Sequence, residues 1–158
     1  MKIKNIAVVY AQPTDGEEKS ALDLVKRVLK KHKINYIISK REELNKRLFQ
    51  NKDLVIAVGG DGTFLRTAHF IFDKTLALGV NSNPRYKEGF FMVTTKKDFE
   101  KKFKKVLKGD YNIKKFRRLE ARIGNKQVSE FALNEFYIAS EKQHHTARYF
   151  LNIRGKKE

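Results

Sequence analysis

Short aliphatic runs and helical stripes alternate along the first eighty residues. Four strand-length runs cover residues 3–10, 34–38, 54–58 and 76–80. Between them, apolar residues recur every three or four positions, which is the spacing of a helix that packs one face on a core. These helical positions are Leu22, Val25, Val28 and Leu29, then Leu44 and Leu48, then Leu65, Ala68, His69 and Phe72. The alternation predicts an α/β fold built on a doubly wound parallel sheet.

Polar residues next to these runs predict where two helices begin. Thr14 and Glu17 have the spacing of a capping box before the first helix, and Ser39 and Glu42 repeat that spacing before the second. The run at 54–58 is almost wholly aliphatic, as expected of a central parallel strand covered on both faces.

The pattern changes near residue 110. A helix is predicted just before it and ends at Gly109; its apolar face comprises Phe99, Phe103, Val106 and Leu107. Strand-like runs follow at 119–123, 128–139 and 149–153, and Gly124-Asn125 suits a hairpin turn between the first two. We therefore predict an α/β domain over 1–110, and over 111–158 the opening antiparallel strands of a β-rich second domain.

Charge and composition narrow the possible functions. The chain has 35 Lys and Arg against 18 Asp and Glu, a net charge of +17, which favours polyanionic ligands. The bases are spread along the chain without a nucleic-acid recognition motif, so a solvated surface is expected rather than nucleic-acid binding. There is no cysteine, and the adjacent His144 and His145 lack partner ligands, so no zinc site is predicted and no residue is assigned as a metal ligand.

Targeting signals are not evident in the sequence. No segment approaches the ~20 apolar residues of a membrane span. The chain runs from Met1 straight into a strand pattern, without the small-residue cleavage site of a signal peptide. We therefore expect a cytoplasmic protein without a membrane span.

The segment Gly59-Gly60-Asp61-Gly62-Thr63 carries the strongest chemical signal. It lies between a buried strand and a helix start, where glycines let an anion approach the backbone and the helix N-terminus favours phosphate. It is not a Walker A motif, because no Gly-Lys-Ser/Thr follows. Asp61 is an unusual acid in such a loop, and it suits a base or a contact to magnesium. The alternative is that Asp61 caps the helix.

Gly-Gly-Asp-Gly-Thr resembles the loop shared by NAD kinases and by diacylglycerol and sphingosine kinases. Two further segments are similar to NAD kinases: Gly-Val-Asn-Ser-Asn-Pro at 79–84 followed by Gly89-Phe90, and Ala-Leu-Asn-Glu at 132–135. Because the three motifs occur in the family's order, the chain is identified as resembling an NAD kinase that stops within its second domain.

The resemblance implies a reaction and a set of site residues. The reaction is transfer of the γ-phosphoryl of ATP, or of polyphosphate, to the adenosine ribose 2′-hydroxyl of NAD, with Mg²⁺ or another divalent cation. Asp61 would be the catalytic proton acceptor. The implied substrate-binding residues are Gly59, Gly60, Gly62, Thr63, Arg66, Asn81, Phe90, Asn134, Glu135 and Arg148.

Several of these roles have alternatives. Arg66 also fits an exposed helical arginine, and Phe90 also fits core packing beside Phe91. If 128–139 is a regular strand, Asn134 and Glu135 point to opposite faces and only one can contact a ligand. Residues 84–88 depart from the family's usual spacing before its glycine-phenylalanine turn, which leaves the choice between NAD and NADH open.

The motifs that the family carries in its second domain, a further Gly-Asp-Gly and a Thr-Gly-Ser-Thr-like segment, do not occur after residue 110. The expected partners besides NAD and ATP are therefore further copies of the chain or a complementing chain with those motifs. Two alternatives stay open: a nucleotide-binding or assembly module without activity of its own, and a lipid kinase that shares the loop.

Overall fold

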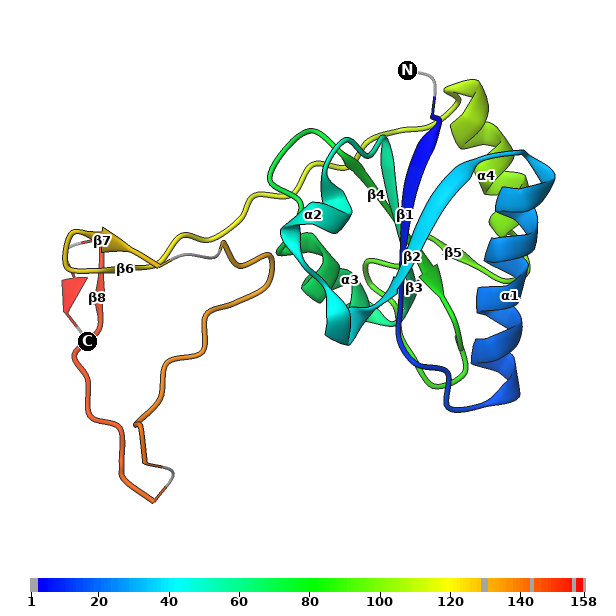
Figure 1. Ribbon diagram of the computed structural model, residues 1–158. Coiled ribbons are helices and arrows are strands. Elements are labelled where there is room, and N and C mark those ends of the chain that lie inside the picture. The colour runs from blue at the N-terminus through cyan, green and yellow to red at the C-terminus, as the bar shows by residue number, and fades with distance from the viewer. Residues whose placement is uncertain (1–2, 129–130, 143, 155, 158) are drawn as a thin grey trace.

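The computed structural model describes residues 3–128, 131–142, 144–154 and 156–157. A parallel five-stranded sheet in the order β2-β1-β3-β4-β5 forms its centre (Figure 1). The strands are β1 (Asn5–Tyr10), β2 (Asn35–Lys40), β3 (Leu54–Gly59), β4 (Leu76–Asn81) and β5 (Thr94–Thr95). The predicted doubly wound parallel sheet is confirmed. Strand β5 was not predicted, because two threonines give no hydrophobic pattern.

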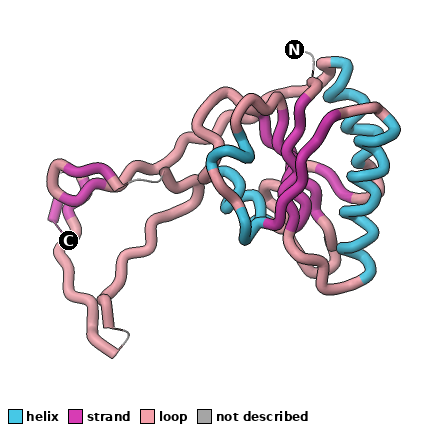
Figure 2. Tube along the Cα trace, viewed as in Figure 1, coloured by secondary structure: helices cyan, strands magenta, loops and turns pink. Residues whose placement is uncertain are grey.

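Helices cover both faces of the sheet (Figure 2). Helices α1 (Gly16–Lys31) and α4 (Phe99–Lys108) lie on one face, and α2 (Lys46–Phe49) and α3 (Asp61–Ala68) on the other. Successive strand residues point to opposite faces, so Val8 joins the core under α1 and α4, whereas Val9 joins the core beside α2. The all-aliphatic β3 is buried along its whole length, as expected for a strand covered on both sides.

Helix α1 begins one residue later than the predicted capping box. The capping pair is Asp15 and Glu18: the Asp15 carboxylate accepts from the Glu18 N–H at 2.8 Å, and the Glu18 carboxylate accepts from the Thr14 N–H at 2.9 Å. The pairing of Thr14 with Glu17 was therefore wrong. The shift places Glu18 in a buried position and leaves Glu17 exposed.

The second predicted capping box, Ser39 with Glu42, was also wrong. Ser39 belongs to β2, and residues Arg41–Glu43 form only a 3₁₀ turn, η1, without a side-chain cap. Helix α2 begins after Asn45, whose side-chain oxygen accepts from the Leu48 N–H at 3.2 Å. A second good capping residue a few positions along the chain thus replaced the predicted one.

Helix α3 occupies its predicted place but buries a different face. Its buried residues are Thr63, Thr67 and Ala68. The helix ends at Ala68, so the predicted helical position of Phe72 was wrong, and 55% of that side chain is exposed. The chain turns after His69 and brings Ile71 into the core beside α2 instead.

Beyond α4 the chain carries only short strands. Gly109 ends α4 with φ of 78°, as predicted. The hairpin at Gly124-Asn125 is confirmed by the antiparallel pair β6 (Arg122–Ile123) and β7 (Lys126–Gln127). Strands β8 (Asn152–Ile153) and β9 (Lys156–Lys157) form a second antiparallel pair.

The long strand predicted over 128–139 was wrong where the structure describes it. An isolated bridge joins Leu119 to Ala132, and irregular backbone follows. Tyr137 and Ile138 are each 90% exposed, because none of the residues that the structure describes forms a second layer over this segment. A strand without a paired neighbour and a covered face gains little from an alternating sequence. The predicted boundary near residue 110 stays a prediction.

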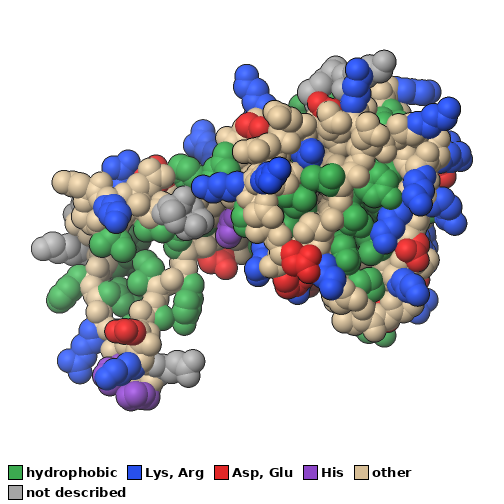
Figure 3. Space-filling model, in the orientation of Figure 1, with side chains coloured by type: hydrophobic (Ala, Val, Ile, Leu, Met, Phe, Trp, Pro, Cys, Tyr) green, Lys and Arg blue, Asp and Glu red, His purple; other side chains and the backbone are tan. Residues whose placement is uncertain are grey.

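Basic side chains are scattered over the visible face of the molecule rather than gathered into one patch (Figure 3). This distribution is what a Lys-rich solvated surface predicts. Within the described residues, no helix is long and apolar enough to cross a membrane.

Candidate functional site

The sheet order creates a topological switch point beside the loop after β3. Strand β1 lies between β2 and β3, so the connections from β1 and β3 run in opposite directions along the sheet. Ligands of open α/β sheets bind at such a switch point, outside the carboxyl ends of the strands. The neighbouring strand ends are tied together there: the Ala11 N–H donates to the Val58 carbonyl at 3.1 Å, and the Ser82 N–H donates to the Gly59 carbonyl at 2.9 Å.

The predicted phosphate loop stands at the N-terminus of α3. Gly59 must be small, because a Cβ there would lie 2.9 Å from the Thr63 Cβ. Thr63 is fully buried, and its hydroxyl oxygen has no hydrogen-bond partner among the described residues. Gly62 is exposed with open space where a Cβ would be. The loop thus brings Gly59, Gly60, Gly62 and Thr63 together at the first turn of α3. The N–H groups of Thr63 and Phe64 donate to the Gly60 carbonyl, whereas those of Asp61 and Gly62 have no partner within the described residues.

Asp61 does not cap the helix. Gly60 occupies the N-cap position, and the Asp61 carboxylate turns to the segment after β4. One carboxylate oxygen accepts from the Phe90 N–H and the other from the Phe91 N–H, each at 2.8 Å. The capping alternative was therefore wrong, and the acid of the loop is joined to the turn that carries Phe90.

Phe90 is not a core residue. Its side chain is 72% exposed and packs edge to face on Phe91, with ring centroids 5.0 Å apart. Phe91 in turn stacks on Phe64 of α3 at 5.3 Å, and the Lys114 ammonium lies 5.3 Å from the Phe90 centroid. The core-packing alternative was wrong. The Phe90 ring stays open to a flat ligand.

Asn81 shapes the segment that connects β4 to this turn. Its amide nitrogen donates to the Lys87 carbonyl at 2.8 Å, and its oxygen accepts from the Asn83 N–H at 3.0 Å. Gly89 has φ of +78°, and a Cβ on it would lie 2.6 Å from the Asn81 amide nitrogen. Both the left-handed backbone and the close contact require glycine here. The buried Asn81 therefore fixes the path of residues 83–89.

Lys87 lies at the loop and was not predicted as a site residue. Its stem packs on Gly60, and its ammonium forms an ion pair with Glu18 and a hydrogen bond of 3.1 Å to the Ser82 hydroxyl. Burial raises the pKa of Glu18, but hydrogen bonds from Lys87 and Thr14 outweigh it and hold the pKa below its usual value. The signal in the sequence was the unusual spacing of residues 84–88, which by itself names no partner.

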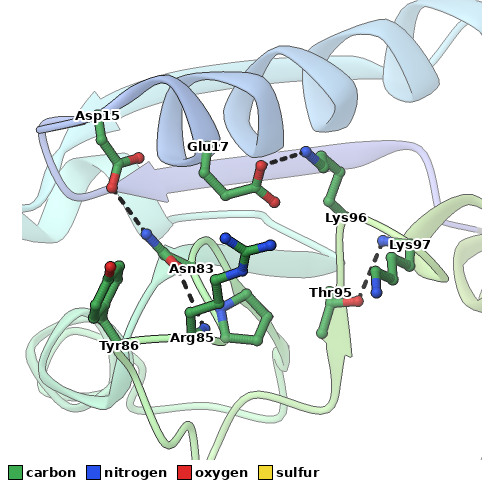
Figure 4. Close-up of a pocket in the computed structure, with 9 residues that line it drawn as sticks. Asp15, Glu17, Asn83, Arg85, Tyr86, Thr95, Lys96 and Lys97 are labelled. Atoms are coloured by element: carbon green, nitrogen blue, oxygen red, sulfur yellow. Dashed lines mark hydrogen bonds and ion pairs between the residues drawn. The ribbon is translucent and has the colours of Figure 1, made fainter.

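A cavity of about 510 Å³ lies beside this segment (Figure 4). The Asn83 amide donates to the Asp15 carboxylate at 2.8 Å on one side, and Lys96 pairs with Glu17 at 2.7 Å on another. Its walls are Asp15, Glu17, Asn83, Pro84, Arg85, Tyr86, Thr95, Lys96 and Lys97. The cavity therefore opens between the first turn of α1 and the start of the 83–89 segment.

Four of the predicted substrate-binding residues are not brought to the loop by any contact in the described part of the chain. Arg66 is exposed on α3. Its charge is felt at Glu42, whose pKa is lowered first by a hydrogen bond from Arg41 and to a smaller degree by Arg66. Asn134, Glu135 and Arg148 are exposed and make no hydrogen bond or ion pair within the residues described. Their roles stay predictions.

Magnesium can be tested against the donors present. Within the described ranges, no group of three or more His, Cys, Asp or Glu side chains could hold a metal ion. Mg²⁺ bound with a nucleotide, however, typically takes only one or two carboxylates besides the phosphates. Each Asp61 oxygen accepts one N–H bond and keeps a further lone pair, so Asp61 fits as such a ligand.

Comparison with known proteins decides the family. The family model described as the ATP-NAD kinase N-terminal domain matches residues 1–111. The chain belongs to the NAD kinase family. It is 29% identical over 155 residues to a probable NADH kinase from Oryza sativa subsp. japonica, covering 88% of this chain and 47% of the relative. It is 31% identical over 104 residues to an NAD kinase from Methanopyrus kandleri, covering 65% and 36%.

A solved structure shows the same fold. The crystal structure of an NAD kinase from Archaeoglobus fulgidus in complex with ATP matches with a TM-score of 0.66 at 25% identity. The match covers 89% of this chain and 50% of that one. The chain therefore spans about half the length of the Oryza sativa relative and of the solved structure, and about a third of the Methanopyrus kandleri relative.

Proposed function

We propose that this chain supplies the phosphate-handling part of an NAD kinase, which transfers the γ-phosphoryl of ATP to the adenosine ribose 2′-hydroxyl of NAD and so forms NADP. The observation that carries the proposal is the position of Asp61. Its carboxylate stands at the N-terminus of α3 and is hydrogen-bonded to the turn that presents the exposed Phe90. The Asp61 carboxylate, the N-terminus of α3 and the exposed Phe90 ring thus lie next to one another.

Each feature has a role in the reaction. A ribose hydroxyl is a poor nucleophile, and a positioned carboxylate such as Asp61 can accept its proton as the new bond forms. The transition state of phosphoryl transfer is loose, so placement and charge neutralisation contribute most of the rate. The N–H groups at the start of α3 bind phosphate, and the Phe90 ring lies against the adenine. Magnesium, when bound with the donor, neutralises part of its charge.

The relatives support both the donor and the acceptor. ATP is the ligand named for the Archaeoglobus fulgidus structure, and the relatives are named as NAD or NADH kinases. The oxidised and the reduced dinucleotide are therefore both tested as acceptors. Asn134, Glu135 and Arg148 are assigned to the acceptor site.

Asp53 provides a matched control for the activity test. Its carboxylate also accepts two backbone N–H groups, from Lys4 and Asn5, each at 2.9 Å. It precedes β3, whereas Asp61 follows that strand, so the two acids stand at opposite ends. Both N–H groups at Asp53 bind one oxygen, whereas those at Asp61 bind one oxygen each. Asp61→Asn and Asp53→Asn thus each neutralise a carboxylate that accepts two backbone N–H groups, but only the first removes the proposed base.

The assay measures NADP or NADPH formation from the dinucleotide, ATP and Mg²⁺. It is run with the chain alone and with a second chain carrying the C-terminal half of a relative. We expect Asp61→Asn to lower kcat by about 10²–10⁴-fold, the usual contribution of a general base, while Asp53→Asn keeps kcat within about twofold. Equal losses in both variants would remove Asp61 as the base. Dinucleotide binding without turnover under both conditions would assign a non-catalytic module instead.

A further inference from the structure

Lys87 contacts three segments that meet beside the phosphate loop. A Cβ added to Gly60 would lie 3.1 Å from the Lys87 Cδ, so the lysine stem rests on the phosphate loop itself. The ammonium continues to the Glu18 carboxylate in the first turn of α1 and to the hydroxyl of Ser82, which follows β4. A full positive charge is thus held next to the loop.

The ion pair with Glu18 is built so that it can be exchanged. The Lys87 side chain keeps 28% of its surface exposed, whereas Glu18 keeps 7%. One Glu18 oxygen pairs with Lys87, and the other accepts from the Thr14 N–H at 2.9 Å and the Thr14 hydroxyl at 3.2 Å. Glu18 therefore keeps two hydrogen bonds from Thr14 when Lys87 turns to another anion, and these partly offset the loss of the ion pair.

A polyphosphate at this loop requires a full cation. It brings several negative charges beside the Asp61 carboxylate, and a helix N-terminus offers only about half a positive charge. Lysine binds phosphate as a point charge on a flexible stem. Other basic groups also lie near the site. Lys114 lies over the Phe90 ring, Arg66 is exposed on α3, and Arg85, Lys96 and Lys97 line the neighbouring cavity. Lys87 is the base whose stem contacts Gly60.

We propose that Lys87 binds the phosphates of the phosphoryl donor beside Gly60 and exchanges the Glu18 carboxylate for a phosphate oxygen as the donor enters. The inference rests on the proposed function for the nature of the donor. Phosphate binding itself is measurable without turnover, so the two proposals can fail separately.

The test titrates the purified chain with tripolyphosphate, ATP and adenosine by isothermal calorimetry at constant ionic strength. Lys87→Met keeps the stem on Gly60 and removes the charge. Lys31→Met is the matched control, because Lys31 pairs with Glu100 at 2.7 Å near the end of α1 and also loses one charge. Melting temperatures check that each variant is folded.

We expect Lys87→Met to weaken the affinity for tripolyphosphate and ATP by tenfold or more, while the affinity for adenosine is unchanged. In Lys31→Met all three affinities should stay within twofold of the wild-type values. Lys87→Arg, which keeps the charge, should recover most of the affinity. Wild-type affinity in Lys87→Met, a loss of ATP but not of tripolyphosphate, or no tripolyphosphate binding by the wild-type chain would each overturn the proposal.

Glu18→Gln tests the exchange. Removing the competing carboxylate should tighten tripolyphosphate binding severalfold, because Lys87 no longer gives up an ion pair. Weaker binding would show that Glu18 merely fixes Lys87 in place. If no NADP forms but Lys87→Met still weakens tripolyphosphate, the proposed function fails and the phosphate site stands. If NADP forms and Lys87→Met binds tripolyphosphate normally, the phosphate site alone fails.

Discussion

The backbone N–H of Phe90 donates a 2.8 Å hydrogen bond to the carboxylate of Asp61, across 29 residues of sequence. The N–H of the next residue donates to the other oxygen of the same carboxylate. The acid of the loop thus holds the turn that presents an exposed aromatic ring. In the proposed reaction, the proton acceptor and the adenine contact are therefore positioned by one group rather than independently.

Replacing Asp61 by Asn should loosen this turn. Asparagine has one acceptor oxygen, so one of the two N–H groups loses its partner and faces the NH₂ group instead. We expect the free energy of unfolding to fall by about 1–3 kcal/mol. Hydrogen exchange of the Phe90 and Phe91 amides should accelerate, whereas in Asp53→Asn it stays at the wild-type rate. Unchanged protection of both amides in Asp61→Asn would contradict the inference that the Asp61 carboxylate holds this turn.

Gly89→Ala should be more destabilising than Gly109→Ala. Both glycines have φ of 78°, so alanine adds the same left-handed strain at each, of about 1 kcal/mol. Only at Gly89 would the new Cβ also meet the Asn81 amide nitrogen, at 2.6 Å; at Gly109 the space is open. Urea unfolding should show a loss about 1–3 kcal/mol larger for Gly89→Ala, as expected for overpacking. Equal losses would mean that the backbone around Gly89 moves away from Asn81 without a measurable loss of stability.

The sheet was predictable because its signal is local. Strands β1, β3 and β4 are short aliphatic runs separated by helical stripes, and burial on both faces favours just that composition. Gly109 and the Gly124-Asn125 turn were likewise predictable. Both glycines adopt the left-handed backbone conformation, which favours glycine at a single position whatever the rest of the fold.

The contacts within the site were not predictable in this way. Lys87 reaches Glu18 across 69 residues, and no spacing along the chain indicates that the segment after β4 folds back over Gly60. The long strand expected at 128–139 failed for a related reason. Alternation stabilises a strand only where a neighbour pairs with it and a second layer covers it, and the exposed Tyr137 and Ile138 lack that cover.

Phe90→Ala should separate stability from binding. Because 72% of the side chain is exposed, the free energy of unfolding should change by less than about 1 kcal/mol. Phe99→Ala, at a fully buried position of α4, should cost about 3–5 kcal/mol. If the Phe90 ring contacts adenine, its loss should weaken the binding of ATP or NAD about tenfold in a calorimetric titration. Unchanged affinity for both nucleotides would remove Phe90 from the site.

The Glu18 ion pair should give stability a defined pH dependence. The folded pKa of Glu18 lies below its usual value of 4.5, so its contribution is fully present above pH 4.5 and is lost as the pH falls through the folded pKa. At pH 7, Glu18→Gln should lower the free energy of unfolding by about 1.5–3 kcal/mol, the range for hydrogen bonds to charged groups. Urea unfolding between pH 7 and pH 3 should show the gap to wild type narrowing below pH 4.5. A gap that widened on acidification would mean that the folded pKa is raised.

The two buried threonines of α3 should respond in opposite directions to replacement by valine. The Thr63 hydroxyl has no partner within the described residues, whereas the Thr67 hydroxyl donates to the Thr63 carbonyl at 2.6 Å. Valine keeps the shape of threonine, so Thr63→Val removes an unpaired polar group and should stabilise the protein by about 1 kcal/mol. Thr67→Val breaks a hydrogen bond and should cost a similar amount. Thermal and urea unfolding of the two variants measure the difference, and a destabilised Thr63→Val would show that the hydroxyl has a partner in solution, such as a bound water at the phosphate loop.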